Sequence, residues 1–167
     1  MSRFDPSLNT LRHQQERLLP STGFVELIRA VLDKGADFRL RAAGKSMYPF
    51  VRDGDVITLR RVPPNQLKIG DIVAIPHPLR GNLIIHRIVA LRNGSVKTKG
   101  DFNLASDGWI SKNNVLGRVI RVERLLQPVQ PAHRFTRYCI ARMSSFSKAF
   151  RYRTAIYKRL LRFGEFY

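Results

Sequence analysis

Residues 72–99 read IVAIPHPLRGNLIIHRIVALRNGSVKTK and contain three segments of strand-like sequence separated by two groups of turn residues. The strand-like segments cover residues 72–75, 83–91 and 96–99, and the turn residues are Arg80-Gly81-Asn82 and Asn93-Gly94. Glycine and asparagine favour turns because they accept backbone conformations that other residues avoid. Strands that follow one another at spacings of about ten residues, with no helix between them, are typical of antiparallel sheets. We therefore predict a compact, mostly antiparallel β domain.

The same pattern continues on both sides of this segment. Further strands are predicted around residues 38–42, 56–58 and 115–122. The turn residues between them are Asp53-Gly54, Pro63-Pro64-Asn65, Gly70 and Asn113-Asn114. Before the first strand, apolar residues recur at helical spacing from Phe24 to Leu32, which predicts a helix beginning at Ser21 or Thr22. Lys34 and Gly35 are expected to end it.

Three segments are expected along the chain. Residues 1–20 have little pattern and are predicted to form a loose N-terminal arm. Residues 21–127 form the β domain with its leading helix, and residues 128–167 form a basic, amphipathic, helical tail. Pro128 and Pro131 would mark the hinge between the last two segments.

The composition of the chain indicates which partners, cofactors and membrane segments to expect. The 167 residues include 30 Lys and Arg against 12 Asp and Glu, a formal net charge of +18 that calls for an anionic partner. The single cysteine, Cys139, excludes an internal disulfide and a cysteine-rich zinc cluster, and no cofactor or metal ion is predicted. No run approaches the 18 to 20 apolar residues of a membrane span, and residues 1–20 are too polar for a signal peptide. We expect a cytoplasmic protein.

The basic tail leaves three interpretations open. Residues 132–167 hold nine basic residues and one acidic residue, interleaved with Phe, Tyr, Leu and Ile. Such a helix could lie on anionic lipid, which would place the protein at the inner face of the membrane. It could instead bind nucleic acid through phosphate contacts and stacking, which we favour less. In the third interpretation its apolar face packs on the β domain while its charges are solvated.

Serine, histidine and aspartate occur in an order that fits nucleophilic catalysis. Ser46 lies in residues 42–55, AAGKSMYPFVRDGD; His86 lies inside an apolar strand; Asp101 and Asp107 follow. A serine nucleophile needs a base to take its proton and a carboxylate to orient that base. By themselves, however, these residues also fit an ordinary turn, a core histidine and aspartates that cap turns.

Four short motifs resemble the signal peptidase I and SOS-repressor superfamily of serine peptidases. Residues 44–49, GKSMYP, with Gly54-Asp55, resemble its nucleophile motif, and residues 70–73, GDIV, resemble the next one. Residues 86–89, HRIV, are similar to the base motif, where bacterial signal peptidases carry lysine and the archaeal and endoplasmic-reticulum branch carries histidine followed by arginine. Residues 99–103, KGDFN, resemble the Lys-Gly-Asp-Asn-Asn stretch of that branch. The resemblance covers roughly residues 37–122.

The resemblance implies a fold and a set of roles. The fold would be the antiparallel, β-barrel-like fold of these peptidases, with an N-terminal helix and a basic C-terminal helix. Ser46 would be the nucleophile, His86 the base, and Asp107, six positions after Asp101, the orienting carboxylate. Asp101 would support that loop or merely cap a turn. Gly44 stands where many signal peptidases have a serine that binds the oxyanion, so backbone N–H groups near Ser46 would have to replace it.

Two functions from different classes follow from the resemblance. The first is a serine endopeptidase of the signal-peptidase type that cleaves an extended peptide or leader sequence of a precursor protein at small residues. The alternative is a catalytically inactive module with the peptidase fold that binds peptide, anionic membrane or nucleic acid. Gly44 and the lack of a membrane anchor ahead of the nucleophile motif favour the alternative.

Overall fold

The computed structural model describes residues 21–77, 80–125 and 127–129. Its elements, in chain order, are helix α2 (Ser21–Asp33), strands β1 (Phe38–Arg41) and β2 (Val56–Arg60), the short 3-10 helix η1 (Pro64–Gln66), strands β3 (Ile72–Pro76), β4 (Leu83–Arg92), β5 (Ser95–Lys99) and β6 (Trp109–Ser111), the 3-10 helix η2 (Lys112–Asn114), and strands β7 (Gly117–Arg124) and β8 (Gln127–Pro128).

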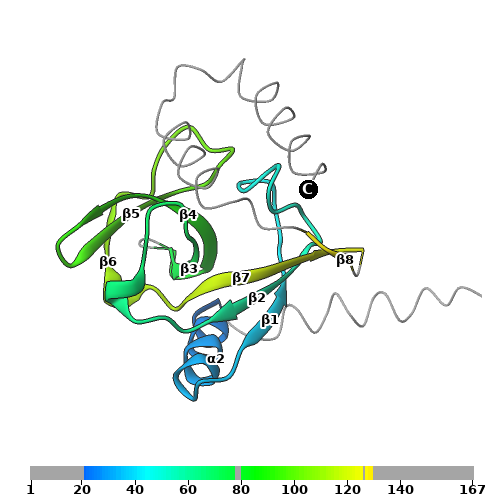
Figure 1. Cartoon of the computed structure of the whole chain (residues 1–167), viewed down its shortest axis with the longest axis horizontal. Helices are drawn as coiled ribbons and strands as arrows, with labels where there is room; N and C mark the ends of the chain where they lie inside the picture. Colours follow the sequence, from blue (N-terminus) through cyan, green and yellow to red (C-terminus); the bar gives the residue numbers. More distant parts are fainter. Residues whose placement is uncertain (1–20, 78–79, 126, 130–167) are drawn as a thin grey trace, which may run out of the picture.

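The strands form one curled antiparallel sheet. Its order is β1-β2-β7-β3-β4-β5-β6, and β8 pairs with β7 beside this path. Strand β7 links the two halves, because its first residues pair with β3 and the rest of it pairs with β2. A register shift between Thr58 and Leu59 in β2 bends the sheet at this point. The result is an open half-barrel with α2 against one side of it (Figure 1).

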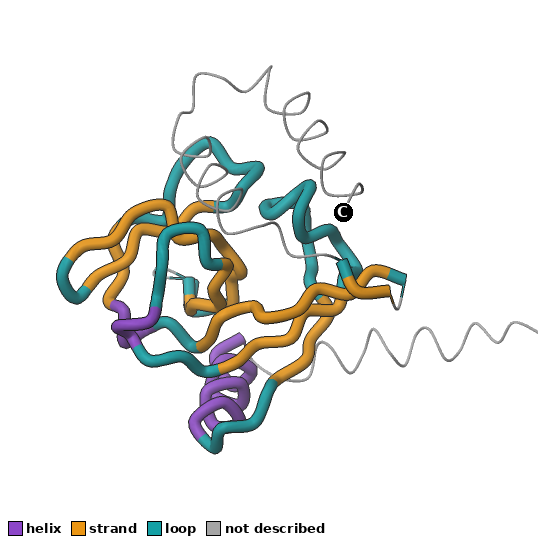
Figure 2. Tube along the Cα trace, in the orientation of Figure 1, coloured by secondary structure: helices purple, strands orange, loops and turns teal. Residues whose placement is uncertain are grey.

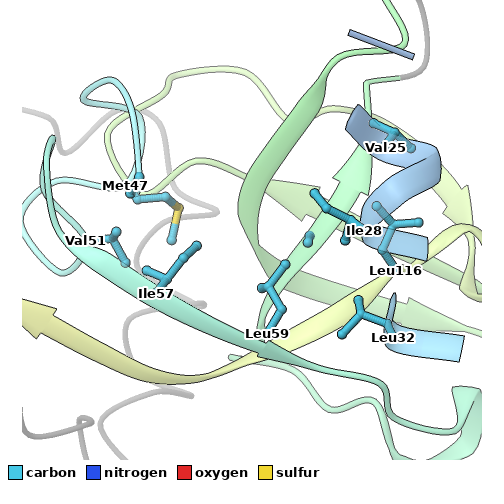
Figure 3. Packing of buried hydrophobic residues seen from close by; sticks show 10 residues of the cluster. Val25, Ile28, Leu32, Met47, Val51, Ile57, Leu59 and Leu116 are labelled. Atoms are coloured by element: carbon cyan, nitrogen blue, oxygen red, sulfur yellow. The ribbon is translucent and has the colours of Figure 1, made fainter. Parts of the chain in front are cut away.

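Helix α2 packs on the first of two hydrophobic clusters. Val25, Ile28 and Leu32, spaced by three and four residues, place one stripe of the helix in the interior. They belong to the same cluster as Leu59 of β2 and Leu116, and Figure 3 shows these side chains between the helix and the sheet. Ile28, Leu32, Leu59 and Leu116 have no exposed surface, so this cluster anchors the helix.

The second cluster lies on the opposite face of β3. Successive strand residues point to opposite faces, so Val73 and Ile75 join the second cluster while Ala74 joins the first. Ile88 of β4, Val96 of β5 and other residues of this half complete the second cluster. Strand β3 is therefore buried on both faces, which explains its uninterrupted apolar sequence.

The mainly β, antiparallel fold with a leading helix is confirmed. Strand β7 begins at Gly117 rather than at residue 115, because Val115 still caps the 3-10 helix η2 and donates its backbone N–H to the carbonyl of Lys112. Strands β6 and β8 are too short to show an alternating pattern and were not predicted. The predicted arm, residues 1–20, and most of the predicted tail, residues 130–167, lie outside the described residues.

Among the described residues, no helix is long and apolar enough to cross a membrane.

Candidate active site

Ser46 lies in the loop of residues 42–55 that connects β1 to β2. Two backbone hydrogen bonds close the base of this loop: Ala42 N–H donates to the carbonyl of Asp55 at 2.7 Å, and Gly54 N–H donates to the carbonyl of Ala42 at 2.9 Å. Met47 and Val51, each 3% exposed, insert into the first hydrophobic cluster (Figure 3). The half-buried Ser46 is thus next to a residue that the core holds in place.

Gly44 has a backbone conformation that glycine adopts more readily than other residues. Its φ is +90°, and its N–H donates to Oδ1 of Asp53 at 2.8 Å. This bond occupies the N–H group two residues before Ser46. Immediately after Ser46 the chain turns, because Tyr48 N–H donates to the carbonyl of Lys45 at 3.1 Å.

A second loop, residues 100–108 between β5 and β6, contacts the Ser46 loop directly. Phe102 N–H donates to the carbonyl of Ser46 at 2.8 Å. The rings of Tyr48 and Phe102 pack edge to face, with 6.2 Å between their centres. Gly100 lies so close that a Cβ atom there would be 2.8 Å from the Ser46 carbonyl oxygen. In Figures 1 and 2 the two loops lie on the same side of the sheet.

His86 and Asp107 form a hydrogen-bonded pair. Nδ1 of His86, on β4, is 2.7 Å from Oδ2 of Asp107, and both side chains are largely buried. The hydroxyl of Thr98, on β5, donates to the same carboxylate oxygen at 2.7 Å. A neutral histidine that donates from Nδ1 to a carboxylate has its other ring nitrogen unprotonated, so this contact is compatible with proton transfer at that nitrogen.

Asp101 pairs with Arg87 rather than with a histidine. Nε and one terminal nitrogen of Arg87 donate to the two carboxylate oxygens of Asp101 at 2.8 and 2.7 Å. Another nitrogen of Arg87 donates to the carbonyl of Gly70 at 2.9 Å, and the guanidinium lies 5.3 Å from the centre of the Phe50 ring. Arg87 and Asp101 are both almost fully buried. This ion pair ties the loop of residues 100–108 to β4 and to the turn before β3.

The structure therefore connects the residues singled out in the sequence in two groups. His86 contacts Asp107, while Arg87 contacts Asp101. The backbone of Ser46 is bonded to the loop that carries both aspartates, but no hydrogen bond within the described residues joins its hydroxyl to His86. The contact of Thr98 with Asp107 was not expected, since a threonine inside a strand has no distinctive pattern.

Among the described residues, no group of three or more His, Cys, Asp or Glu side chains could hold a metal ion.

Comparison with known proteins identifies the family. The model of the family described as Peptidase S24-like matches residues 10–105, more than half of the chain. The chain belongs to the Peptidase S24-like family. The S24-like match includes Ser46, His86 and Asp101 and ends two residues before Asp107. A comparison with curated proteins finds no match.

Proposed function

We propose that this S24-like chain is a serine endopeptidase of the signal-peptidase type, with Ser46 as nucleophile, His86 as base and Asp107 as orienting carboxylate. The observation that carries the proposal is the 2.7 Å hydrogen bond between His86 and Asp107, made on the loop that also bonds to the backbone of Ser46. A histidine held by a carboxylate through Nδ1 is one arrangement that activates a serine nucleophile.

In this mechanism the Ser46 hydroxyl attacks the carbonyl carbon of the scissile peptide bond while His86 accepts its proton. His86 then donates that proton to the leaving amine, and a water molecule hydrolyses the acyl-enzyme in the same way. Asp107 keeps Nδ1 protonated and stabilises the imidazolium that forms after each proton transfer.

The oxyanion of the tetrahedral intermediate needs hydrogen-bond donors near Ser46. Gly44 N–H already donates to Asp53, and Tyr48 N–H already donates to the carbonyl of Lys45. Within the described residues, the backbone N–H groups of Ser46 and of its neighbours Lys45 and Met47 make no hydrogen bond, so these are the candidate donors. Loss of one such donor typically lowers kcat on the order of 100-fold or more.

The substrate is proposed to be an extended peptide or leader sequence with small residues at the cleavage site. An extended peptide can add to a sheet edge through backbone hydrogen bonds. The part of the substrate on either side of the cleavage site would then be recognised mainly through its backbone.

Cleavage of Ala-X-Ala leader peptides, in detergent or liposomes, tests this function. We expect Ser46→Ala to lower kcat/KM at least about a thousandfold, and Asp107→Asn to lower it about 100-fold or more, because the base loses its orientation. Ser95→Ala, a serine at the start of β5, is the matched control and should cleave like the wild type. Equal cleavage by Ser46→Ala and wild type, or no cleavage by the wild type under any condition, would contradict the proposal.

Absence of cleavage by the wild type would favour the alternative function, an inactive module that binds peptide. The observation on its side is that the Ser46 hydroxyl makes no hydrogen bond to His86 within the described residues. Binding of the same peptides without cleavage, measured by calorimetry, would support that function.

A further inference from the structure

Thr98 connects a rigid strand to the carboxylate that holds His86. It is fully buried on β5, and its hydroxyl donates to Oδ2 of Asp107 at 2.7 Å. The threonine hydroxyl is the donor of this bond and the carboxylate oxygen is the acceptor. In return the backbone N–H of Asp107 donates to the carbonyl of Thr98 at 2.9 Å. The aspartate is thus held by one residue through both its main chain and its side chain.

The two strands that carry Thr98 and His86 are neighbours in the sheet. Ile88 of β4 pairs with Thr98, and Arg87 pairs with Lys99. Asp107, by contrast, lies on the loop before β6, where the backbone lacks the support of a strand ladder. A side chain on a strand is positioned more accurately than one on a loop. Because Thr98 is fixed on β5 beside β4, its hydroxyl holds the Asp107 carboxylate at a defined position relative to these two strands. The loop alone would position the carboxylate less accurately.

We propose that Thr98 is a positioning residue that keeps the Asp107 carboxylate on Nδ1 of His86 and so selects the imidazole tautomer with its proton on Nδ1. The catalytic consequence rests on the proposed peptidase function, whereas the effect on the tautomer does not. Only that tautomer leaves the other ring nitrogen, Nε2, able to accept a proton from a serine. Without the hydroxyl, Asp107 can rotate, both tautomers become populated, and fewer molecules carry a competent base.

Other charged groups near this pair stay the same when Thr98 is replaced. On the neighbouring elements these are Arg87 of β4 with its partner Asp101, Lys99 of β5, and Asp71 before β3, whose carboxylate is 3.6 Å from Arg118. Substitution of a neutral threonine changes none of these charges. A change in the tautomer of His86 would therefore result from the lost hydrogen bond between Thr98 and Asp107.

The test compares Thr98→Val with Thr98→Ser in the full-length chain. Valine has nearly the shape of threonine and is favoured in strands, but it cannot donate the hydrogen bond; serine can. Thr58→Val, at a second buried threonine on β2, is the control for replacing a buried threonine by valine. We measure kcat and KM on a peptide that the wild type cleaves, and the protonation of the two His86 ring nitrogens by ¹⁵N NMR at neutral pH.

We expect Thr98→Val to lower kcat about tenfold or more with KM nearly unchanged, because a hydrogen bond to a charged group is lost from the catalytic pair and not from substrate binding. The Nδ1–H signal of His86 should weaken in Thr98→Val, while Thr98→Ser and Thr58→Val resemble the wild type in both measurements.

An unchanged Nδ1–H signal in Thr98→Val would overturn the proposal, and so would an equal loss of kcat in Thr98→Ser. If the wild type cleaves no peptide, the peptidase function fails, but the NMR comparison still decides the role of Thr98.

Discussion

Phe102 donates its backbone N–H to the carbonyl of Ser46 at 2.8 Å, although 55 residues separate the two in the sequence. This bond joins the loop that carries the proposed nucleophile to the loop that carries Asp101 and Asp107. Since it involves only main-chain atoms, its geometry depends on the paths of the two loops. The site should therefore be sensitive to changes that separate these loops, even when no proposed catalytic residue is altered.

Gly100→Ala should separate the two loops. The new Cβ would lie 2.8 Å from the Ser46 carbonyl oxygen and 2.8 Å from Nδ2 of Asn103, closer than such atoms approach in folded proteins. We expect peptide cleavage to fall at least tenfold and the free energy of unfolding to fall by about 1–3 kcal/mol, measured by urea denaturation.

The control for this prediction is Gly94→Ala in the β4–β5 turn. Gly94 has a φ of +71° and open space around its Cα, so alanine there adds backbone strain of roughly 1–2 kcal/mol without steric contact near Ser46. Gly94→Ala should lose stability but keep its cleavage rate. Equal loss of cleavage in both variants would show that the loops are not sensitive to the contact at Gly100.

Asp101→Asn should destabilise the fold strongly. The change leaves the Arg87 guanidinium, almost fully buried, without the carboxylate that compensates its charge. Removal of one partner from a buried ion pair costs about 3–5 kcal/mol. Chemical denaturation should show a loss of this size. Asp33→Asn is the comparison, because it breaks the ion pair with Arg61, in which the two side chains are 50% and 39% exposed, and such pairs contribute about 1 kcal/mol or less. Similar losses in both variants would contradict the structural role assigned to the Asp101–Arg87 pair.

Asp37 should titrate below the usual range of an aspartate. Arg60 donates two hydrogen bonds to its carboxylate, at 2.8 and 2.7 Å, and these lower the pKa of Asp37. A lowered pKa in the folded state means that the pair stabilises the fold above the unfolded pKa of Asp37. This contribution disappears as the pH falls through the lower, folded pKa.

NMR titration of the Asp37 carboxyl measures this effect. In Arg60→Gln the pKa of Asp37 should rise toward its ordinary value, and any difference in stability between variant and wild type should vanish at low pH. An unchanged pKa of Asp37 in Arg60→Gln would show that Arg60 is not its cause.

The basic tail is proposed to bind an anionic membrane surface. Nine basic residues and one acidic residue among residues 132–167 give a net charge of +8, and each basic residue near an anionic surface contributes about 1 kcal/mol. Replacement of Arg151, Arg153, Lys158 and Arg159 by glutamine should therefore weaken sedimentation with anionic liposomes. Wild-type binding should decrease as salt rises and screens the attraction.

Neutral liposomes provide the control for the tail. Equal sedimentation of wild type and variant with anionic liposomes would contradict lipid binding by the tail. Displacement of the wild type from liposomes by short DNA at micromolar concentration would favour nucleic acid as its partner.

Much of the fold could be predicted because local sequence reports burial. The apolar segments of β3 and β4, the short segment of β5 and the turn residues between them predict three successive antiparallel strands without reference to the rest of the chain. Strand β6 could not be predicted in this way. Its three residues are a strand because they pair with β5, so their conformation depends on a partner rather than on their own pattern.

The sequence by itself determined the antiparallel β fold, the leading helix and the order of Ser46, His86 and the two aspartates. Only the tertiary structure decided which aspartate contacts His86, which one compensates Arg87, and that Thr98 holds Asp107. The physical reason is that the alternation of apolar and polar side chains along a strand specifies which face of the strand is buried. This pattern involves only residues that are close together in the sequence. The partner of a polar side chain depends on the curl of the sheet and on the paths of the loops, which involve residues far apart in the chain.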